Sequence, residues 1–308
     1  MFDKSGIKTL VILFGVLLIA VIYLLFFSSG GERSFRKDLV NIDTAKVNEI
    51  SILPKNAKDT IDLIKIEKEW KIKLPNSKTA SVPKNKVISL LNDLVKIKPT
   101  VLASRNKDEW KELQVDDSSA SRIKVFENGN PALDIFIGKI AFQQPNSIST
   151  YVRLHNDVDV YKTEGYLGMT LGRTPSDFRN TDIVKSSKST WQKLTFQYPA
   201  DSSFVLARDG SKWKISNTYT DSAKTEQLLN NLEHVSALNF NDNFKPADFQ
   251  KPVYKLFIDI NDTTTIRVDG YMDSSKVVLH SSQNPESYFD DNKAVHEKLF
   301  LSQKRFLK

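Results

Sequence analysis

The stretch "EKEWKI", Glu67–Ile72, decides how this chain is organised, because its last three residues return in "SKWKI", Ser211–Ile215. Tryptophan is scarce, with four in 308 residues, so a second copy of Trp-Lys-Ile is unexpected in an unrepeated chain. In a strand, successive side chains point to opposite faces, which places Trp and Ile on one face and Lys on the other. A buried Trp covers about 150–250 Å2 and dominates a small core. The repeated tripeptide therefore predicts two cores of one design.

The segments that precede each tripeptide also recur in the same order. Each copy opens with Phe-Arg, at Phe35 and at Phe178, and continues into a short alternating segment that ends at a proline. Residues 60–72 then alternate as a strand that ends on the tripeptide. The corresponding residues 204–215 predict a hairpin with its turn at Asp209-Gly210.

A helix is expected next in each copy, in "SVPKNKVISLLNDLVKI" (81–97) and in "TDSAKTEQLLNNLEHV" (220–235). Apolar or small side chains recur there at i, i+3, i+4 and i+7, which makes one stripe along a helix. The stripe residues are Val87, Leu90, Leu91 and Leu94 in the first copy and Thr225, Leu228, Leu229 and Leu232 in the second. Pro83 suits the first turn of one helix, and Asp221 or Ser222 suits the cap of the other.

Alternating runs around Asn128-Gly129 and around Asn261-Asp262 follow the helices, and further strands extend each meander. Strands with one helix against them define an α+β module. The predicted fold is one N-terminal transmembrane helix followed by two tandem, duplicated lobes of antiparallel sheet with one packed helix each. The predicted domains are residues 1–31 (cytoplasmic stub and anchor), 32–177 (first lobe) and 178–308 (second lobe).

Thr9–Phe27, "TLVILFGVLLIAVIYLLFF", carries no charged residue. At about 1.5 Å per residue a helix of this length spans roughly 28 Å, close to the hydrocarbon thickness of a bilayer. A buried core helix and a cleaved signal peptide are the alternatives. The run is longer than a signal peptide's apolar region and lacks a small-residue cleavage motif, which favours an uncleaved anchor. Basic residues on its two sides are nearly balanced, so charge alone leaves the orientation open.

Composition excludes several classes of protein. The formal net charge is +7, but basic and acidic residues alternate along the chain, whereas nucleic-acid binders concentrate basic residues beside stacking aromatics. No cysteine occurs, which excludes disulfides, thiolate metal sites, cysteine nucleophiles and a lipoprotein-type cysteine anchor.

Motifs that carry chemistry are not found, and no catalytic, cofactor-binding or metal-binding residue is predicted. The four histidines lack metal-ligand spacing, and "HEKLF" at His296 has Phe300 where a zinc-protease helix needs its second His. Asp157 and Asp159 lack the ligand series of a calcium loop and are interpreted as outward residues of a strand. The glycine-rich "GYLGMTLG" (165–172) is interpreted as a linker between the lobes.

The order of these pieces resembles a bacterial family known as DUF4340, from about Phe35 to the carboxyl end. The resemblance rests on "FRKDLVNID", the Trp-Lys-Ile strand with "LLNDL", "DEWKELQV" (Asp108–Val115), "LDIFIGK" (Leu133–Lys139), "TYVRL" (Thr150–Leu154) and "FRNTDIV". It implies a bitopic protein of the bacterial inner membrane, with its C-terminal bulk extracytoplasmic. It also implies partners among ABC transporter permeases or gliding-motility-type membrane subunits. Members of the family often carry Gly where this chain has Gln114, which leaves the local turn open.

We therefore expect a non-catalytic, membrane-anchored accessory protein of an ABC transporter or envelope complex, which binds partners through sheet edges and loops of its extracytoplasmic lobes. The alternative is an anchored envelope hydrolase or polysaccharide-binding protein. A hydrolase of that kind needs a concave pocket with two close carboxylates. A scaffold that only spaces other components is a third possibility.

Overall fold

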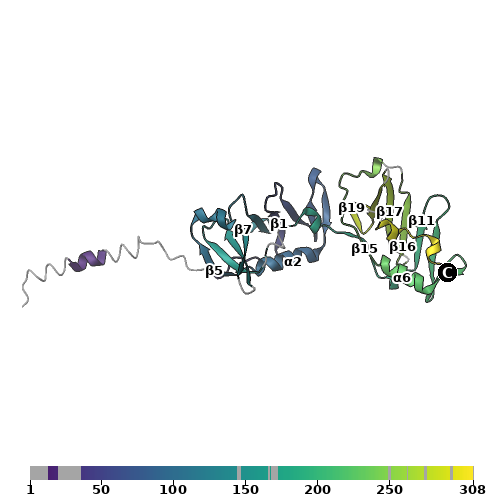
Figure 1. Ribbon diagram of the computed structural model, residues 1–308, viewed down its shortest axis with the longest axis horizontal. Coiled ribbons are helices and arrows are strands. Elements are labelled where there is room, and N and C mark those ends of the chain that lie inside the picture. Colours follow the sequence, from purple (N-terminus) through teal and green to yellow (C-terminus); the bar gives the residue numbers. More distant parts are fainter. Residues whose placement is uncertain are drawn as a thin grey trace, which may run out of the picture.

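Two antiparallel sheets, each with one long helix against it, form the body of the protein (Figure 1). The computed structural model describes residues 13–19, 36–143, 147–165, 167, 173–248, 251–261, 263–273, 276–291 and 294–307. Figure 1 shows the sheets as two lobes placed end to end along the long axis. The predicted α+β class with two antiparallel lobes is confirmed.

The first lobe holds a sheet with the strand order β4-β3-β2-β1-β6-β7-β8-β9-β5. Helix α2 connects β4 to β5. The elements are β1 (Val47–Leu53), β2 (Ile61–Ile66), β3 (Glu69–Lys73), β4 (Thr79–Val82), α2 (Lys84–Val95), β5 (Pro99–Ser104), α3 (Trp110–Leu113), β6 (Ser121–Glu127), β7 (Asn130–Gln143), β8 (Ser147–Leu154), β9 (Val160–Glu164) and α5 (Pro175–Phe178).

The second lobe holds a sheet with the order β14-β13-β12-β11-β16-β17-β18-β19, and β10 pairs with β15 beside it. The elements are β10 (Asp182–Lys185), β11 (Lys193–Gln197), β12 (Phe204–Asp209), β13 (Lys212–Ile215), β14 (Thr218–Tyr219), α6 (Ser222–Leu232), β15 (His234–Ser236), β16 (Tyr254–Asp259), β17 (Thr265–Asp273), β18 (Lys276–Ser281), β19 (Asn284–Asp290) and α7 (His296–Leu299).

The two sheets repeat one another strand for strand, apart from β5, which extends only the first. In each sheet the first strand pairs with the next strand of the chain on one side and with a strand from beyond the long helix on the other. β1 lies between β2 and β6, and β11 lies between β12 and β16, so the two occupy the same position. Trp70 on β3 and Trp213 on β13 both lie on the second strand outward from that position, and Ile72 and Ile215 are buried beside them. Trp70 is buried and Trp213 is half-buried. This arrangement is what two copies of one unit produce.

One detail of the first copy differs from the prediction. Residues 60–72 were expected to form a single strand, but β2 and β3 form a hairpin that turns at Glu67, whose φ is 56°. Left-handed φ angles favour Gly or Asn, so the Glu-Lys dipeptide gives no local turn signal. The second copy carries the expected Asp209-Gly210 turn, with φ 59° at Gly210.

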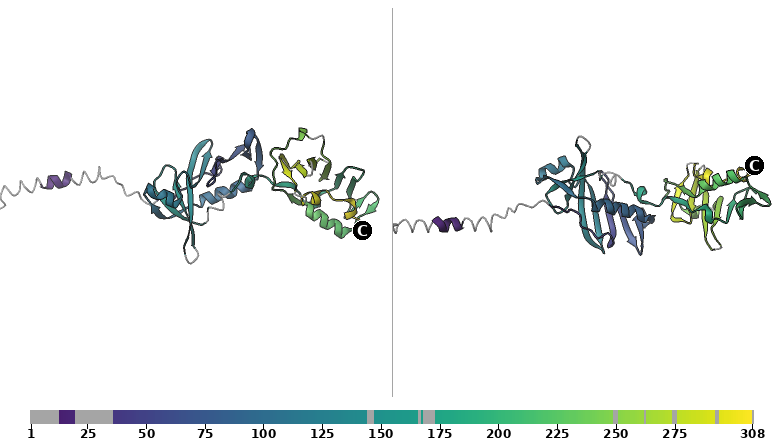
Figure 2. Two further views of the ribbon diagram at one scale, coloured as in Figure 1. Left: turned by 45° about the horizontal axis from the view of Figure 1, so that its top comes forward. Right: turned by 90° about the horizontal axis from the view of Figure 1, so that it is seen from below.

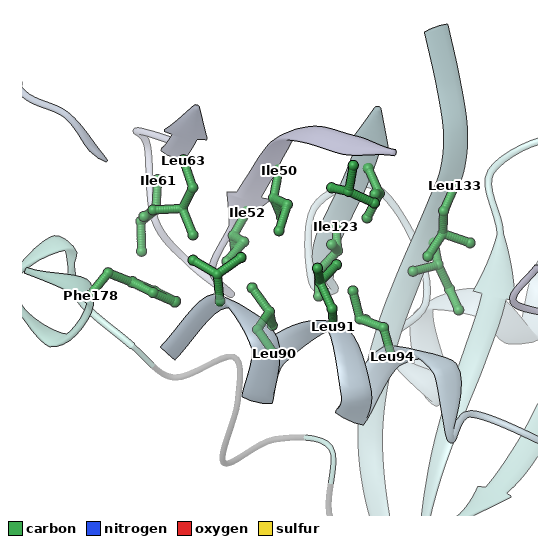
Figure 3. Close-up of a cluster of buried hydrophobic side chains, with 14 of the residues drawn as sticks. Ile50, Ile52, Ile61, Leu63, Leu90, Leu91, Leu94, Ile123, Leu133 and Phe178 are labelled. Atoms are coloured by element: carbon green, nitrogen blue, oxygen red, sulfur yellow. The ribbon is translucent and has the colours of Figure 1, made fainter. Parts of the chain in front are cut away.

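The two helices lie where the periodicity places them. The four stripe residues of α2 and the four of α6 are all buried. Figure 3 shows the α2 leucines pointing at the sheet, toward Ile50, Ile52 and Ile123. Each buried Leu contributes roughly 1.5–3 kcal/mol by leaving water, so these stripes hold the helices on the sheets. Asp221 caps α6 by accepting a hydrogen bond from the Lys224 amide at 3.0 Å.

The lobes meet edge to edge through the outermost strands β4 and β19. The Asn180 amide donates to the Ser81 carbonyl of β4 at 2.8 Å, and Asn284 Nδ2 of β19 donates to the Asn180 carbonyl at 2.7 Å. Lys71 Nζ lies 2.6 Å from Glu286 Oε1 across the same junction. Polar and ionic contacts therefore join the lobes.

The chain crosses from one core to the other at Phe178 and Arg179. Phe178 is buried in the core of the first lobe, although the repeat aligns it with the start of the second copy. Arg179 is buried in the second lobe, where NH1 lies 2.8 Å from Asp242 Oδ1 and NH2 donates to Ser287 Oγ at 3.2 Å. Its guanidinium carbon lies 3.7 Å from the centre of the Phe240 ring.

The expected membrane anchor, Thr9–Phe27, lies mostly outside the described residues. Residues 13–19 are helical, and their large apolar side chains are exposed. Among the described residues, no helix is both long and apolar enough to cross a bilayer.

Candidate binding cleft in the first lobe

Strand β7 runs on past its neighbour β6 and leaves part of one edge without a strand partner. β6 begins at Ser121, which pairs with Ile137, so beyond this point Ile140–Gln143 pair only with β8 as far as the described strands go, and Gly138 and Lys139 lie in a bulge. Figure 2 shows the β7–β8 hairpin extending beyond the rest of the first lobe. An unpaired strand edge presents backbone N–H and C=O groups that another chain can bind.

A cleft of ≈ 640 Å3 opens beside this edge. We call it the basic cleft. It is lined by residues of the 54–61 loop, Gln114, Ser121, Ile137–Ile140 and Arg173–Pro175. Its volume lies within the range of about 300–1,000 Å3 that is usual for binding sites.

A β-bulge shapes the floor of the basic cleft. The register of β7 against β8 shifts between Ile137 and Ile140, which re-aims the side chains of the strand at this point. A Cβ added at Gly138 would lie 2.4 Å from the Leu113 carbonyl oxygen, so the end of α3 packs directly on the β7 backbone. Glycine is required here because no side chain fits between the two backbones.

Gln114 ends α3 in the left-handed conformation, with φ 56° and ψ 38°. Gly adopts that conformation without steric cost, so a Gly at this position would be free of the backbone strain that Gln114 carries. The Gln114 side chain makes a contact that Gly could not make, because its Oε1 accepts a hydrogen bond from Lys55 Nζ at 2.8 Å. The Lys55 amide also donates to Ser121 Oγ at 3.0 Å, which ties the 54–61 loop to the start of β6.

The turn after Gln114 is held by Asp116. Partial burial raises the pKa of this carboxyl group, but hydrogen bonds from Ser118 and Ser119 outweigh burial and lower the pKa to about 2. Ser118 Oγ donates to Asp116 Oδ1 at 2.5 Å, and Ser119 Oγ donates to Oδ2. The ionised Asp116 therefore stabilises the segment that leads into β6.

The charge of the basic cleft is strongly one-sided. Lys55, Lys58, Lys139 and Arg173 line it, and Asp59 is the one carboxylate among its lining residues in the described chain. Lys58 is exposed, and within the described residues neither Lys58 nor Arg173 forms a salt bridge. A cleft lined by one sign of charge raises the local concentration of oppositely charged ligands.

The projecting part of the hairpin also exposes apolar side chains. Phe142 is 78% exposed, and Ile148, its Cα partner on β8, is 39% exposed. Single exposed apolar residues are ordinary on protein surfaces, but this pair stands on the same hairpin that carries the open edge. Edge and apolar pair together form a surface suited to protein contacts.

An aromatic pocket of ≈ 540 Å3 lies in the second lobe, between Tyr198, Tyr254 and Phe300. The rings of Tyr198 and Tyr254 meet edge to face, with centroids 5.9 Å apart. Tyr198 Oη donates to the Leu301 carbonyl at 2.8 Å, and burial followed by the nearby Tyr254 raises the pKa of Tyr198. No carboxylate is among the lining residues of this pocket in the described chain.

The histidines and acidic residues that the sequence singled out do not come together in one site. Among the described residues, no group of three or more His, Cys, Asp or Glu is placed to hold a metal ion. His155 lies against Phe136 and His280 stacks on Tyr288, so both histidines belong to aromatic contacts. His296 is half-buried against Tyr254, and this burial lowers its pKa.

The interpretation of Asp157 and Asp159 as outward strand residues is wrong. Both lie in the connection between β8 and β9, and Asp159 is buried. Tyr161 Oη donates to Asp159 Oδ2 at 3.4 Å, and Asp157 Oδ2 lies 3.5 Å from Arg36 NH2. The glycine-rich segment 165–172 lies mostly outside the described residues.

Sequence reasoning missed the buried Arg153 of "TYVRL". Its guanidinium lies between the rings of Trp110 and Phe136, with its central carbon 3.7 Å and 4.3 Å from their centres. Arg153 Nε donates to the Val115 carbonyl at 3.0 Å, and burial lowers its pKa. The sequence gives no signal for this burial, because Arg153 alternates with Val152 and Leu154 of the core face and so stands where an outward polar residue is expected.

The fold and the cleft define an α+β protein of two like lobes with a candidate binding cleft in the first. The chain belongs to the family described as "Domain of unknown function (DUF4340)", which matches residues 70–253. The matched region runs from Trp70 in the first lobe to Val253 in the second and contains α3, the β7 bulge and both long helices. No match was found among curated proteins or among solved structures.

Proposed function

We propose that this chain is a non-catalytic accessory protein that docks onto a membrane partner through its first lobe. The observation that carries the proposal is the open edge of β7 at Gly138–Gln143, beside the basic cleft and the exposed Phe142. Strand addition to such an edge is a recurring mode of protein recognition.

The proposal includes a membrane anchor at Thr9–Phe27. The uncharged run of this segment supports it, because a helix of that length matches the bilayer core. The bulk of the chain then lies on the extracytoplasmic side of a bacterial inner membrane. The partner in this proposal is an ABC transporter permease or a gliding-motility-type membrane subunit, the kind that the sequence resemblance implies.

Co-purification tests the docking role. The full-length chain carries an affinity tag at its carboxyl end and is recovered from cross-linked, detergent-solubilised membranes. Phe142→Asp changes the hairpin, and Leu238→Asp, at a residue 72% exposed in the second lobe, is its matched control. We expect recovery of a permease-like subunit with the unchanged chain and the control, and severalfold less with Phe142→Asp. A chain recovered without any permease-like subunit contradicts the transporter role.

The absence of cysteine makes the orientation directly testable. Ser211→Cys places one thiol at the exposed β12–β13 turn, and Ser5→Cys places one before the expected span. In cells with a permeabilised outer envelope, a membrane-impermeant maleimide is expected to label Ser211→Cys and to spare Ser5→Cys. Labelling of Ser5→Cys alone reverses the proposed orientation.

A polysaccharide-binding role is the second candidate, and the aromatic pocket around Tyr198, Tyr254 and Phe300 favours it. Titration calorimetry with soluble envelope oligosaccharides tests this role. Binding that is lost in Tyr254→Ala and kept in Phe142→Asp supports the second candidate over the first.

A further inference from the structure

We infer that the basic cleft binds an extended, acidic segment of a partner protein, which adds as a strand to the open edge of β7. This inference rests on the proposed docking role and assigns the chemistry of the segment that docks. Three independent features of the cleft support it: an unpaired backbone edge, an excess of positive charge and a mixed apolar lining.

The backbone edge sets the shape of the ligand. On one side of β7, Ile140–Gln143 pair with β8 and Gly138 and Lys139 lie in the bulge, while on the other side β6 ends its pairing at Ile137, so the open edge runs from Gly138 to Gln143. A bound segment would occupy the strand position that β6 leaves before Ser121. At about 3.4 Å per residue this edge is about 20 Å long, which suits a short extended peptide.

The charge sets the composition of the ligand. Lys55, Lys58, Lys139 and Arg173 surround the cleft against one acid, Asp59. Lys58 is exposed, and Lys139 lies at a loose 3.8 Å from Glu112 Oε1, so these amino groups remain available for a ligand. Carboxylates on alternate residues of an added strand would point to one side of the sheet, because strand side chains alternate.

The lining explains why a segment of protein is favoured over a small anion. Ala57, Ile140 and Pro175 contribute apolar surface between the basic residues, above the buried side chains of Ile61 and Ile137. A free phosphate offers nothing to bury there, whereas an alternating acidic and β-branched segment matches both kinds of surface. Gly138 keeps the β7 backbone accessible from the cleft while α3 covers the other side of the residue.

Fluorescence anisotropy with the purified full-length chain in detergent tests the inference. The probe is a fluorescein-labelled peptide of alternating Glu and Val. One control peptide has the same charge but a central Pro, which removes a backbone donor and blocks strand pairing. A second control alternates Lys and Val. We expect the Glu-Val peptide to bind at least about tenfold more tightly than either control, and its binding to weaken as salt is added.

Charge-reversal variants test the location. Lys58→Glu combined with Arg173→Glu changes two cleft residues that form no salt bridge within the described chain. Lys68→Glu combined with Lys276→Glu makes the same change of charge at two exposed residues elsewhere. We expect the cleft variant to bind the Glu-Val peptide about tenfold more weakly and the control variant to bind within about twofold. Circular dichroism verifies that both variants are folded.

Three results overturn the inference. If the Pro-containing peptide binds as tightly as the Glu-Val peptide, strand addition is excluded. If the cleft variant and the control variant lose the same amount of affinity, the cleft is excluded as the binding site. Complete displacement of the probe by vesicles of phosphatidylglycerol assigns the cleft to a lipid surface instead. Peptide binding by a chain that captures no permease-like subunit leaves this inference standing while the transporter role fails, so the two failures are distinguishable.

Discussion

Substitutions of Arg179 and of its partner Asp242 are expected to lower the stability of the second lobe by unequal amounts. The Arg179 side chain is 2% exposed and the Asp242 side chain is 42% exposed, with 2.8 Å between NH1 and Oδ1. Burial lowers the pKa of Arg179, and Asp242 opposes this effect. The guanidinium therefore depends on its partner more than the carboxylate does.

Asp242→Ala leaves a buried cation with only Ser287 Oγ as a side-chain hydrogen-bond acceptor in the described chain. Removing one partner of a buried pair costs about 3–5 kcal/mol, and we expect about 3 kcal/mol because Asp242 itself is partly solvated. Arg179→Met keeps most of the buried volume and leaves a carboxylate that water can reach, so it is expected to cost about 1 kcal/mol. The expected difference in the free energy of unfolding is about 2 kcal/mol.

Urea unfolding of the full-length chain measures both costs, followed by tryptophan fluorescence, to which the buried Trp191 of the second core contributes. Hydrogen exchange in β19 separates the second lobe from the first. Asp248→Ala, at an exposed acid nearby, is the control and is expected to change stability by less than about 0.5 kcal/mol. Equal costs for Asp242→Ala and Arg179→Met, or a larger cost for Arg179→Met, would refute the reasoning.

Three further predictions concern single elements. Leu91→Ala and Leu229→Ala should each destabilise their own lobe by about 2–5 kcal/mol in urea titrations, because both are buried at the same point of repeated helices; a mild effect in one lobe alone contradicts equivalence. The pKa of Asp116 is lowered to about 2, so its stabilisation is present above about pH 4 and lost as the pH falls toward 2. Asp116→Asn should therefore cost about 1 kcal/mol at pH 7, allowing for solvent screening, with a smaller difference from the unchanged chain at pH 3; a constant difference argues against this cause. Gln114→Gly should raise the free energy of unfolding by about 0.5–1 kcal/mol, because it relieves a left-handed φ of 56° at a half-buried residue; a loss of stability means that the Lys55 contact outweighs backbone relief.

Local periodicity predicted most of the fold. The stripes of α2 and α6, the cap at Asp221 and the Asp209-Gly210 turn all follow from residues within a few positions of one another. The shared order of the segments predicted two like lobes, and the strand orders agree with it. Where a local signal was missing, as at the Glu67 turn, the prediction was wrong.

The basic cleft could not be predicted in this way. It depends on where β6 stops against β7, on the bulge near Gly138 and on the approach of Arg173 from a distant segment. The sequence shows Lys55, Lys58 and Lys139 as ordinary members of a dispersed basic composition. Only their placement around one cavity makes them a candidate site.

The sequence by itself determined most of the secondary structure, the repeat and the apolar N-terminal run, because each is encoded in the spacing of neighbouring side chains. Tertiary structure alone decided which strand edge stays open, why Phe178 packs in the first core, and how Arg153 and Arg179 are buried. The physical reason is that pairing ends, cavities and buried charges depend on contacts between residues far apart in the chain, which no local pattern records.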